Sequence, residues 1–218
     1  MEEENRTILI EWARVFGINL DERTLEAFVL YQKELLKWNQ KISLTAVRTE
    51  KGIIVKHFLD SLSVFPYLSS PYSLLDIGSG AGFPGIPLKI VSPSLNITLI
   101  DSVRKKVDFQ RHILRMLDLK GIEAIHGRVQ DKEILNNLGG RFDIVISRAF
   151  SDLRTFLILS FPFLKEGGRA IAMKGEAGND EIRLFAEAEG IRFRLPEIIP
   201  LTLPSSSFKR TILVFKKE

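Results

Sequence analysis

The chain has 218 residues, of which 45% are apolar and 27% charged, and this suits one globular α/β domain with a small extension but not two large domains. No apolar run reaches the length of a membrane span, and the net charge is only +4. The absence of cysteine excludes disulfides, thiolate zinc sites and cysteine nucleophiles. Because three scattered histidines lack ligand spacing and the acidic N-terminus lacks a signal-peptide core, we expect a cytosolic protein without a metal site.

Residues 1–70 are predicted to form a helical extension. Apolar residues recur there at helical spacing in two stretches, and Asp21 is placed to cap the second. The apolar positions are Ile8, Leu9, Trp12 and Phe16, followed by Leu25, Phe28, Val29, Leu35 and Leu36. Proline and serine gather near residues 66–73 and mark a break. We therefore predict an extension over residues 1–70 that packs on a core of residues 71–218 to give one compact unit.

After this break, strand patterns alternate with helix patterns. The predicted strands cover residues 73–77, 96–101, 122–126, 142–147 and 169–174, and the predicted helices cover 84–91, 104–118, 153–164 and 178–189. Two last strands, near 191–199 and 210–215, are predicted to form an antiparallel hairpin at the sheet edge. Repeated strand, crossover and strand predict an α/β fold with a mostly parallel, Rossmann-like sheet covered by helices.

The most informative stretch for function is the glycine loop that follows the first predicted strand. Asp76 stands near the strand end, and Gly78, Gly80 and Gly82 allow the backbone to turn tightly and to approach a ligand without a Cβ in the way. The next strand ends at Asp101, whose carboxylate can bind ribose hydroxyls. This pattern predicts a cofactor that contains adenosine, and nicotinamide, flavin and S-adenosylmethionine folds all use it.

The register of the loop favours S-adenosylmethionine. A literal Gly-x-Gly-x-x-Gly occurs at residues 80–85, but counted from Gly78, directly after the strand, the third glycine position is occupied by Phe83. The Asp76 carboxylate would repel a pyrophosphate, whereas it suits the sulfonium and ammonium groups of S-adenosylmethionine. The alternative is that Asp76 caps the following helix or orders the turn.

Basic charge is concentrated in two segments. Residues 101–130 carry seven basic and four acidic side chains, and residues 192–218 carry six and two. On the predicted helix 104–118, Arg104, Arg111 and Arg115 fall on one side and form a stripe beside the predicted cofactor site. Such a stripe is typical of a solvated helix face or of a surface that binds a phosphate backbone, and the sequence leaves both open.

Seven short motifs occur along the chain, and their combination in this order indicates a family more specifically than any single motif does. They are residues 37–45 (KWNQKISLT), 57–61 (HFLDS), 76–87 (DIGSGAGFPGIP), 101–106 (DSVRKK), 128–130 (RVQ), 147–150 (SRAF) and 174–175 (KG). In this order they resemble the bacterial small-subunit rRNA guanine-N7 methyltransferases, historically called glucose-inhibited division protein B. The resemblance implies a class I S-adenosylmethionine-dependent methyltransferase fold. It also implies methyl transfer to a guanine N7 in the decoding region of 16S rRNA or the small ribosomal subunit.

The resemblance also implies roles for individual residues. It places cofactor contacts at Gly78, Phe83, Val129, Gln130 and Arg148, and the loop and strand-end arguments add Asp76, Gly80 and Asp101. Arg148 is expected to orient the target guanine through O6 or a phosphate, with a structural ion pair to Asp152 as the alternative. The candidate rRNA phosphate contacts, any of which is equally typical of ordinary surface, are Lys105, Lys106, Arg128, Lys174, Lys209 and Arg210.

The chemistry of guanine N7 requires little from side chains. The N7 lone pair carries no proton, so we expect no general base, and the main requirement is in-line placement of N7, methyl carbon and sulfur. Two other functions stay open, a methyltransferase that acts on a small molecule or protein and a nicotinamide-dependent oxidoreductase. We also expect a monomer, and we interpret Trp38 and His57 as packing or capping residues.

Overall fold

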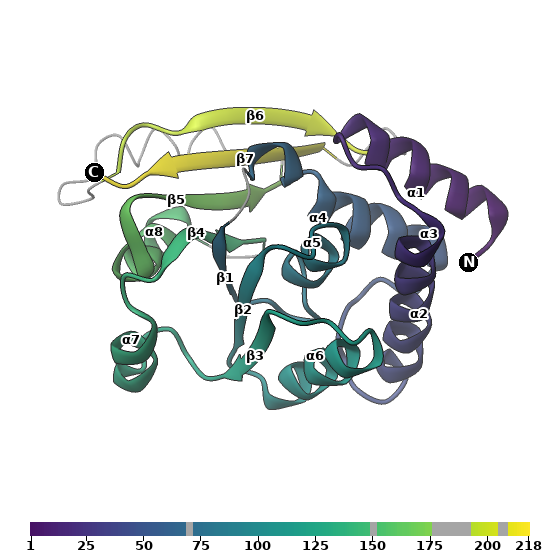
Figure 1. The fold of residues 1–218 in the computed structure, drawn as a ribbon, viewed down its shortest axis with the longest axis horizontal. Helices are drawn as coiled ribbons and strands as arrows, with labels where there is room; N and C mark the ends of the chain where they lie inside the picture. The colour runs from purple at the N-terminus through teal and green to yellow at the C-terminus, as the bar shows by residue number, and fades with distance from the viewer. Residues whose placement is uncertain (69–71, 149–151, 176–192, 205–208) are drawn as a thin grey trace.

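Seven strands form one sheet within the residues that the computed structural model describes, which are 1–68, 72–148, 152–175, 193–204 and 209–218. The spatial order is β3-β2-β1-β4-β5-β7-β6 (Figure 1). The strands are β1 (Ser73–Ile77), β2 (Asn96–Asp101), β3 (Ile122–His126), β4 (Phe142–Ser147), β5 (Leu164–Lys174), β6 (Glu197–Thr202) and β7 (Lys209–Lys216). The first five pair in parallel, and β7 runs antiparallel to both β5 and β6. The predicted fold class and antiparallel C-terminal edge are confirmed.

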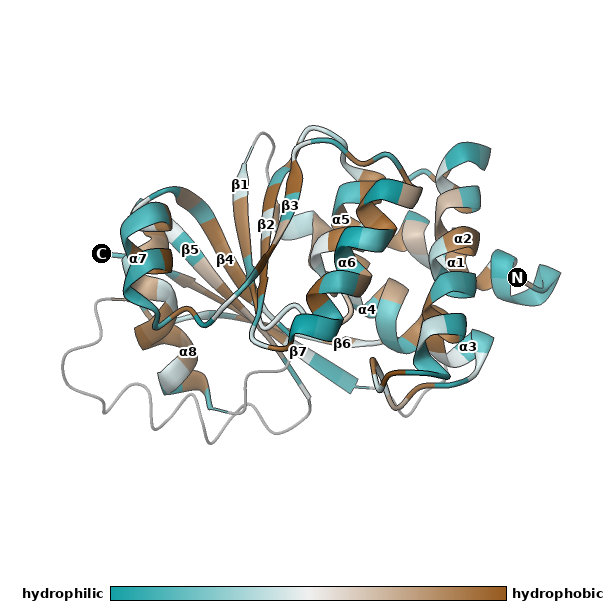
Figure 2. Cartoon of the chain, turned by 90° about the horizontal axis from the view of Figure 1, so that it is seen from below, coloured by the Kyte–Doolittle hydropathy of each residue, from teal (hydrophilic) through white to brown (hydrophobic). Residues whose placement is uncertain are grey.

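Helices cover both faces of this sheet. They are α1 (Glu3–Val15), α2 (Glu22–Asn39), α3 (Glu50–Ile53), the π-helix η1 (Ile54–Leu59), α4 (Asp60–Leu62), the 3-10 helix η2 (Phe65–Tyr67), α5 (Gly85–Val91), α6 (Arg104–Met116), α7 (Lys132–Leu138), α8 (Leu153–Ser160) and the 3-10 helix η3 (Phe161–Phe163). Figure 2 shows α7 and α8 on one side of the sheet, with α5 and α6 on the other side and α1 and α2 outside them. Among the described residues, no helix combines the length and apolar character needed to cross a membrane.

Successive side chains of a strand point to opposite faces of the sheet, and this divides the hydrophobic core into two clusters. In β1, Leu74 faces the cluster that includes α5, α6 and the N-terminal helices, and Leu75 faces the cluster beneath α8. Both side chains are fully buried, as expected for a central strand that is covered on both faces. The first cluster continues into the extension through Phe28 and Phe58, so the extension and the sheet share one core.

The N-terminal helices form as their sequence pattern predicts. Asp21 caps α2, because its Oδ1 accepts a hydrogen bond from Thr24 N at 2.8 Å. The buried face of α2 centres on Phe28, Tyr31 and Leu35, whereas the predicted Val29 and Leu36 are half-buried. Tyr31 is fully buried and its hydroxyl donates to Ala81 O at 2.6 Å. Thus α2 makes a direct contact with the glycine loop.

The element bounds agree with prediction for β1 to β4 and differ later in the chain. The strand predicted at 169–174 begins at Leu164, because Gly167 and Gly168 weaken the strand pattern of the segment that precedes it. The strand predicted at 191–199 is β6, Glu197–Thr202, whose register is set by antiparallel pairing with β7. Two helices end earlier than predicted, at Met116 and Ser160, and α7 is additional. The helix predicted at 178–189 lies outside the described residues.

Candidate active site

The glycine loop makes the tight turn that its sequence predicts. Gly78, Gly80 and Gly82 have φ of 69°, 60° and 99°, a region that other residues rarely adopt. Their surroundings differ, however. A Cβ on Gly82 would lie 2.4 Å from Ile86 Cδ1, whereas a Cβ on Gly78 would meet nothing within 4 Å. Gly82 is therefore required by packing against α5, and Gly78 leaves open space beside the loop.

The loop amides are already engaged within the protein. Gly78 N and Ser79 N both donate to Ile100 O, at 2.9 and 3.1 Å, and Gly80 N donates to Asp101 Oδ2 at 2.8 Å. A dinucleotide loop needs such amides for the pyrophosphate. The donor set therefore fits a cofactor without phosphate, and this disfavours the nicotinamide-dependent alternative.

Asp76 does not reach the wall of either cavity described below. Its carboxylate is fully buried, and Oδ2 accepts a hydrogen bond from Gly85 N at 2.9 Å at the first residue of α5. Oδ1 has no partner among the described residues. Burial raises the pKa of this carboxyl to about 7. The structure thus favours the helix-cap interpretation of Asp76 over the predicted cofactor contact.

A crevice of about 390 Å³ lies at the carboxyl ends of β1, β2 and β3. This is where open α/β sheets bind ligands. Its lining residues are Ile77, Gly78, Ile100, Asp101, Ser102, Gly127, Arg128, Val129 and Gln130. The structure therefore brings together four of the predicted cofactor residues, Gly78, Asp101, Val129 and Gln130.

Asp101 is held rigidly at the floor of this crevice. Its Oδ2 accepts from Gly80 N and its Oδ1 accepts from Val103 N, both at 2.8 Å. Only 5% of the residue is exposed. Each carboxylate oxygen keeps a further lone pair that can accept a hydrogen bond from a ribose hydroxyl.

A second cavity of about 170 Å³ adjoins the first and shares Gly78 with it. It is lined by Leu44, Thr45, His57, Gly78, Ser79, Gly80, Ala81, Phe83, Lys106 and Arg148. Predicted residues from three separate motifs therefore meet here. Residues 44, 45 and 57 come from the N-terminal extension, which closes one side of this pocket.

Asn39 holds the extension loop that reaches the pocket. At the end of α2, its Nδ2 donates to Thr45 O at 2.9 Å, and its Oδ1 accepts from Leu44 N at 2.8 Å and Thr45 N at 3.0 Å. Thr45 Oγ1 in turn lies 2.7 Å from His57 Nε2. The hydrogen bonds within the 37–45 motif therefore hold Thr45 in contact with His57.

Phe83 forms an apolar wall of the pocket, as the resemblance implies. Its ring stacks on His57 with centroids 4.6 Å apart and on Tyr31 at 5.3 Å, and the Cζ of Arg148 lies 4.9 Å from its centroid. Only 3% of Phe83 is exposed. His57, which the sequence pattern assigns to packing or capping, therefore does pack, but it also lines the pocket and contacts Arg148.

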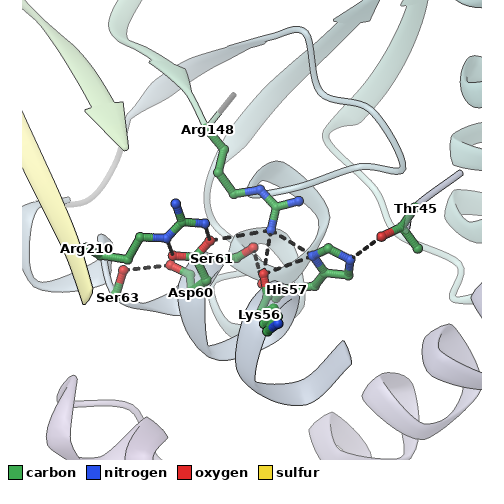
Figure 3. A network of polar contacts seen from close by, with 8 residues as sticks. All are labelled: Thr45, Lys56, His57, Asp60, Ser61, Ser63, Arg148 and Arg210. Atoms are coloured by element: carbon green, nitrogen blue, oxygen red, sulfur yellow. Dashed lines mark hydrogen bonds and ion pairs between the residues drawn. The ribbon is translucent and has the colours of Figure 1, made fainter. Parts of the chain in front are cut away.

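Arg148 takes part in a polar network between the extension and the sheet (Figure 3). Its Nη1 donates to Lys56 O at 3.0 Å, and it lies 3.0 Å from His57 Nδ1 and 3.5 Å from Asp60 Oδ2. The structural ion pair considered as an alternative is present, but its partner is not the suggested Asp152, which caps α8 by accepting from Thr155 N at 2.8 Å. The ion pair of Arg148 is with Asp60.

His57 is neutral in this network. Burial, followed by the charge of Arg148, lowers the pKa of His57 to about 3. Its Nδ1 lies 3.0 Å from Arg148 Nη1 and 2.9 Å from Lys56 O, and its Nε2 lies 2.7 Å from Thr45 Oγ1. Burial also lowers the pKa of Arg148 below its ordinary value.

The candidate phosphate contacts fall into three groups. Lys105, Arg128 and Lys209 are exposed, whereas Lys106 and Lys174 are half-buried, and Lys106 lines the pocket. Arg210 is different, because it forms a bidentate ion pair with buried Asp60 and so has a structural partner that the sequence pattern does not reveal. In the predicted stripe on α6, Arg104 and Arg115 are exposed, but Arg111 Nε donates to Ala124 O at 3.0 Å.

Comparison with known proteins identifies the family. The family model GidB, described as rRNA small subunit methyltransferase G, matches residues 24–204. The chain belongs to this family. It is 43% identical over 218 residues to ribosomal RNA small subunit methyltransferase G of Geotalea uraniireducens, covering 100% of this chain and 99% of that protein. The protein of the same name in Acetivibrio thermocellus is 39% identical over 97% of this chain and 88% of its own length.

Solved structures support the same fold class. A predicted O-methyltransferase from Agrobacterium tumefaciens has a TM-score of 0.58 at 18% identity, covering 73% of this chain and 79% of that one. TYW2 from M. jannaschii in complex with AdoMet has a TM-score of 0.52 at 18% identity, covering 69% and 71%. These similarities show the methyltransferase fold, and the family match adds that the enzyme is S-adenosylmethionine-dependent.

Proposed function

We propose that this chain transfers the methyl group of S-adenosylmethionine to N7 of a guanine in 16S rRNA of the small ribosomal subunit. The observation that carries the proposal is the pair of adjoining cavities that share Gly78. One presents a fixed carboxylate and no phosphate cradle, and the other presents cationic side chains and an aromatic wall. The family match and the names of the relatives supply the substrate class.

The crevice residues supply the parts of a cofactor site. Asp101 accepts hydrogen bonds from the ribose hydroxyls, and the Val129–Gln130 segment covers and reads the adenine. The exposed backbone at Gly78 allows the methionyl portion to approach closely. Phe83, in the adjoining pocket, supplies an apolar wall beside it. When bound, S-adenosylmethionine supplies an electrophilic methyl carbon on a sulfonium.

The pocket residues orient the nucleophile. Guanine N7 needs no base, because its lone pair carries no proton. Arg148 and Lys106 place cationic donors where O6 or a phosphate of the target nucleotide can accept. Orientation of N7 toward the methyl carbon is the main contribution of the protein to the rate.

Surface cations outside the pocket provide contacts with the rRNA backbone. Arg128 lines the crevice, Lys105 lies on α6, and Lys174 and Lys209 lie on the strands β5 and β7. Such contacts weaken as salt rises because they release counterions. We further propose a cytosolic monomer, and size-exclusion chromatography with light scattering tests the oligomeric state.

Labelled methyl transfer tests the proposal. Small subunits and deproteinised 16S rRNA from a strain that lacks the enzyme are incubated with S-adenosylmethionine labelled in the methyl group, and the modified base is mapped. We expect label at one guanine N7 and no label after treatment with ribonuclease. Absence of label from every guanine N7 would refute the proposal. Transfer that survives digestion of RNA would instead support a small-molecule or protein substrate.

A further inference from the structure

Asp60 is a fully buried carboxylate that lies between two arginines from distant parts of the chain. Its Oδ1 accepts from Arg210 Nε at 2.9 Å, and its Oδ2 accepts from Arg210 Nη2 at 2.8 Å and lies 3.5 Å from Arg148 Nη1. Ser63 Oγ donates to the Asp60 carbonyl oxygen at 2.6 Å. A bidentate pair fixes the plane of a carboxylate as well as its position. Arg210 on β7 therefore sets the orientation of the group that Arg148 meets.

Arg148 uses only one of its guanidinium nitrogens in this network. Figure 3 shows the contacts to Lys56, His57 and Asp60 converging on Nη1. Among the described residues, Nε and Nη2 have no hydrogen-bond partner, and neither is a buried orphan. With the Phe83 ring also packed against the guanidinium, its orientation is fixed while two donor nitrogens remain at the pocket.

Two positive charges meet at Asp60. Two guanidinium groups share one carboxylate, and the side chains of Arg148 and Arg210 are only 16% and 18% exposed. A partly buried guanidinium with free donor nitrogens, as Arg148 has, is stabilised by an oxygen acceptor that a ligand brings to it. Lys106 adds a second cation to the same pocket. The chemistry suits a carbonyl or phosphate oxygen of a nucleotide.

We propose that Asp60, fixed by Arg210, positions Arg148 so that its Nε and Nη2 donors hold an oxygen of the target nucleotide while N7 faces the methyl donor. This inference rests on the proposed function. Asp60 and Arg210 act through Arg148 and do not touch the nucleotide, so they are positioning residues. Arg210 therefore contributes from inside the protein and is not one of the rRNA phosphate contacts.

Asp60→Asn and Arg210→Lys test this assignment in single-turnover methyl transfer to small subunits. Both variants should lower the rate on the order of 100-fold, since a misplaced orienting group has this effect on a positioned reaction. Affinity for S-adenosylmethionine, measured by calorimetry, should change by less than about threefold, because the crevice residues lie outside the network. Glu34→Gln is the matched control. It removes another ion pair of the extension, with His112 at 2.6 Å, and should keep the wild-type rate.

The Arg148→Lys background separates positioning from a purely structural role. There, Asp60→Asn or Arg210→Lys should cost less than about threefold in rate, because the group they orient is already altered. An equal loss in both backgrounds would overturn the inference, as would a wild-type rate for Arg210→Lys. That variant keeps a cation beside Asp60, so it remains informative if thermal unfolding shows that Asp60→Asn does not fold. Failure of the wild-type protein to label rRNA would refute the proposed function instead.

Discussion

The crevice at the sheet edge takes its residues from the ends of three neighbouring strands, whereas the pocket beside it takes residues from the extension, the β1 loop and the end of β4. In the crevice, Asp101 is held by the amides of Gly80 and Val103. In the pocket, Arg148 is held by a carbonyl 92 residues away in sequence. The crevice, which is the proposed cofactor half, is thus a property of the α/β sheet, and the pocket, which is the proposed substrate half, exists only once the extension has packed against it.

Arg148→Ala should break the substrate half most completely. We expect methyl transfer to fall on the order of 1000-fold, because removal of a preorganised donor that orients the reacting group has effects of this size. The loss should appear mainly in the rate constant at saturating S-adenosylmethionine, measured by single-turnover labelling. Circular dichroism must show a folded protein. A folded variant with more than about a tenth of the wild-type rate would contradict the role of Arg148.

Asp101→Ala should break the cofactor half. Loss of charged hydrogen bonds to the ribose should cost about 3 kcal/mol, or roughly 100-fold in affinity for S-adenosylmethionine. Calorimetry measures this directly, and binding of rRNA in the absence of cofactor should be unchanged. Asp108→Ala is the control, because Asp108 is an exposed acid on α6. Equal affinities for the two variants would remove Asp101 from the site.

Asp76→Asn sharpens the comparison, because it separates helix capping from cofactor binding. In the folded protein the pKa of Asp76 is raised from 3.8 to about 7, so the unfolded chain loses this proton first and stability falls as pH rises between these values. The substitution should therefore raise the free energy of unfolding by about 2–4 kcal/mol at pH 8 and by clearly less at pH 5. Urea unfolding at the two pH values measures this difference.

The same variant also tests the predicted contact between Asp76 and the cofactor. Because Asp76 is buried beneath the loop, affinity of Asp76→Asn for S-adenosylmethionine should stay within about threefold of wild type. A tenfold or greater loss, measured by calorimetry, would reinstate Asp76 as a cofactor-binding residue.

The smallest effects are expected for Gly82→Ala and Gly78→Ala. Together these variants separate a glycine that is needed for packing from one that is needed for ligand binding. The Cβ of Gly82→Ala would overlap Ile86, so unfolding should become easier by about 1–3 kcal/mol. Gly78→Ala has free space and should cost about 1 kcal/mol through its positive φ, but Gly78 lines both cavities, so the variant should lower cofactor affinity. Thermal unfolding and calorimetry on the pair should therefore rank them in opposite order for stability and for cofactor affinity.

The cofactor half could be predicted from the sequence because its determinants are local. Each strand end is visible as an apolar run followed by a polar residue, and parallel strands bring their carboxyl ends to one edge. This reasoning places Asp101 and the 128–130 segment correctly beside Gly78. It does not distinguish a glycine required by a ligand from one required by packing, as Gly82 illustrates.

The substrate half could be predicted only as a set of motifs. No periodicity reveals that His57 meets Arg148 or that Asp60 meets Arg210, since these pairs are separated by 91 and 150 residues. Proximity in sequence suggested Asp152 as the partner of Arg148, but that carboxylate is used at the start of its own helix. The motifs 37–45 and 57–61 indicate the family, but they do not predict which residues their side chains contact.

A crystal structure of the complex with S-adenosylmethionine tests the two-part site most directly. We predict adenine against the Val129–Gln130 segment, ribose hydroxyls on Asp101, and a sulfonium beside Gly78 with its methyl carbon directed toward Phe83 and Arg148. A methyl carbon that points away from the pocket, or a cofactor bound outside the strand-end crevice, would contradict the account.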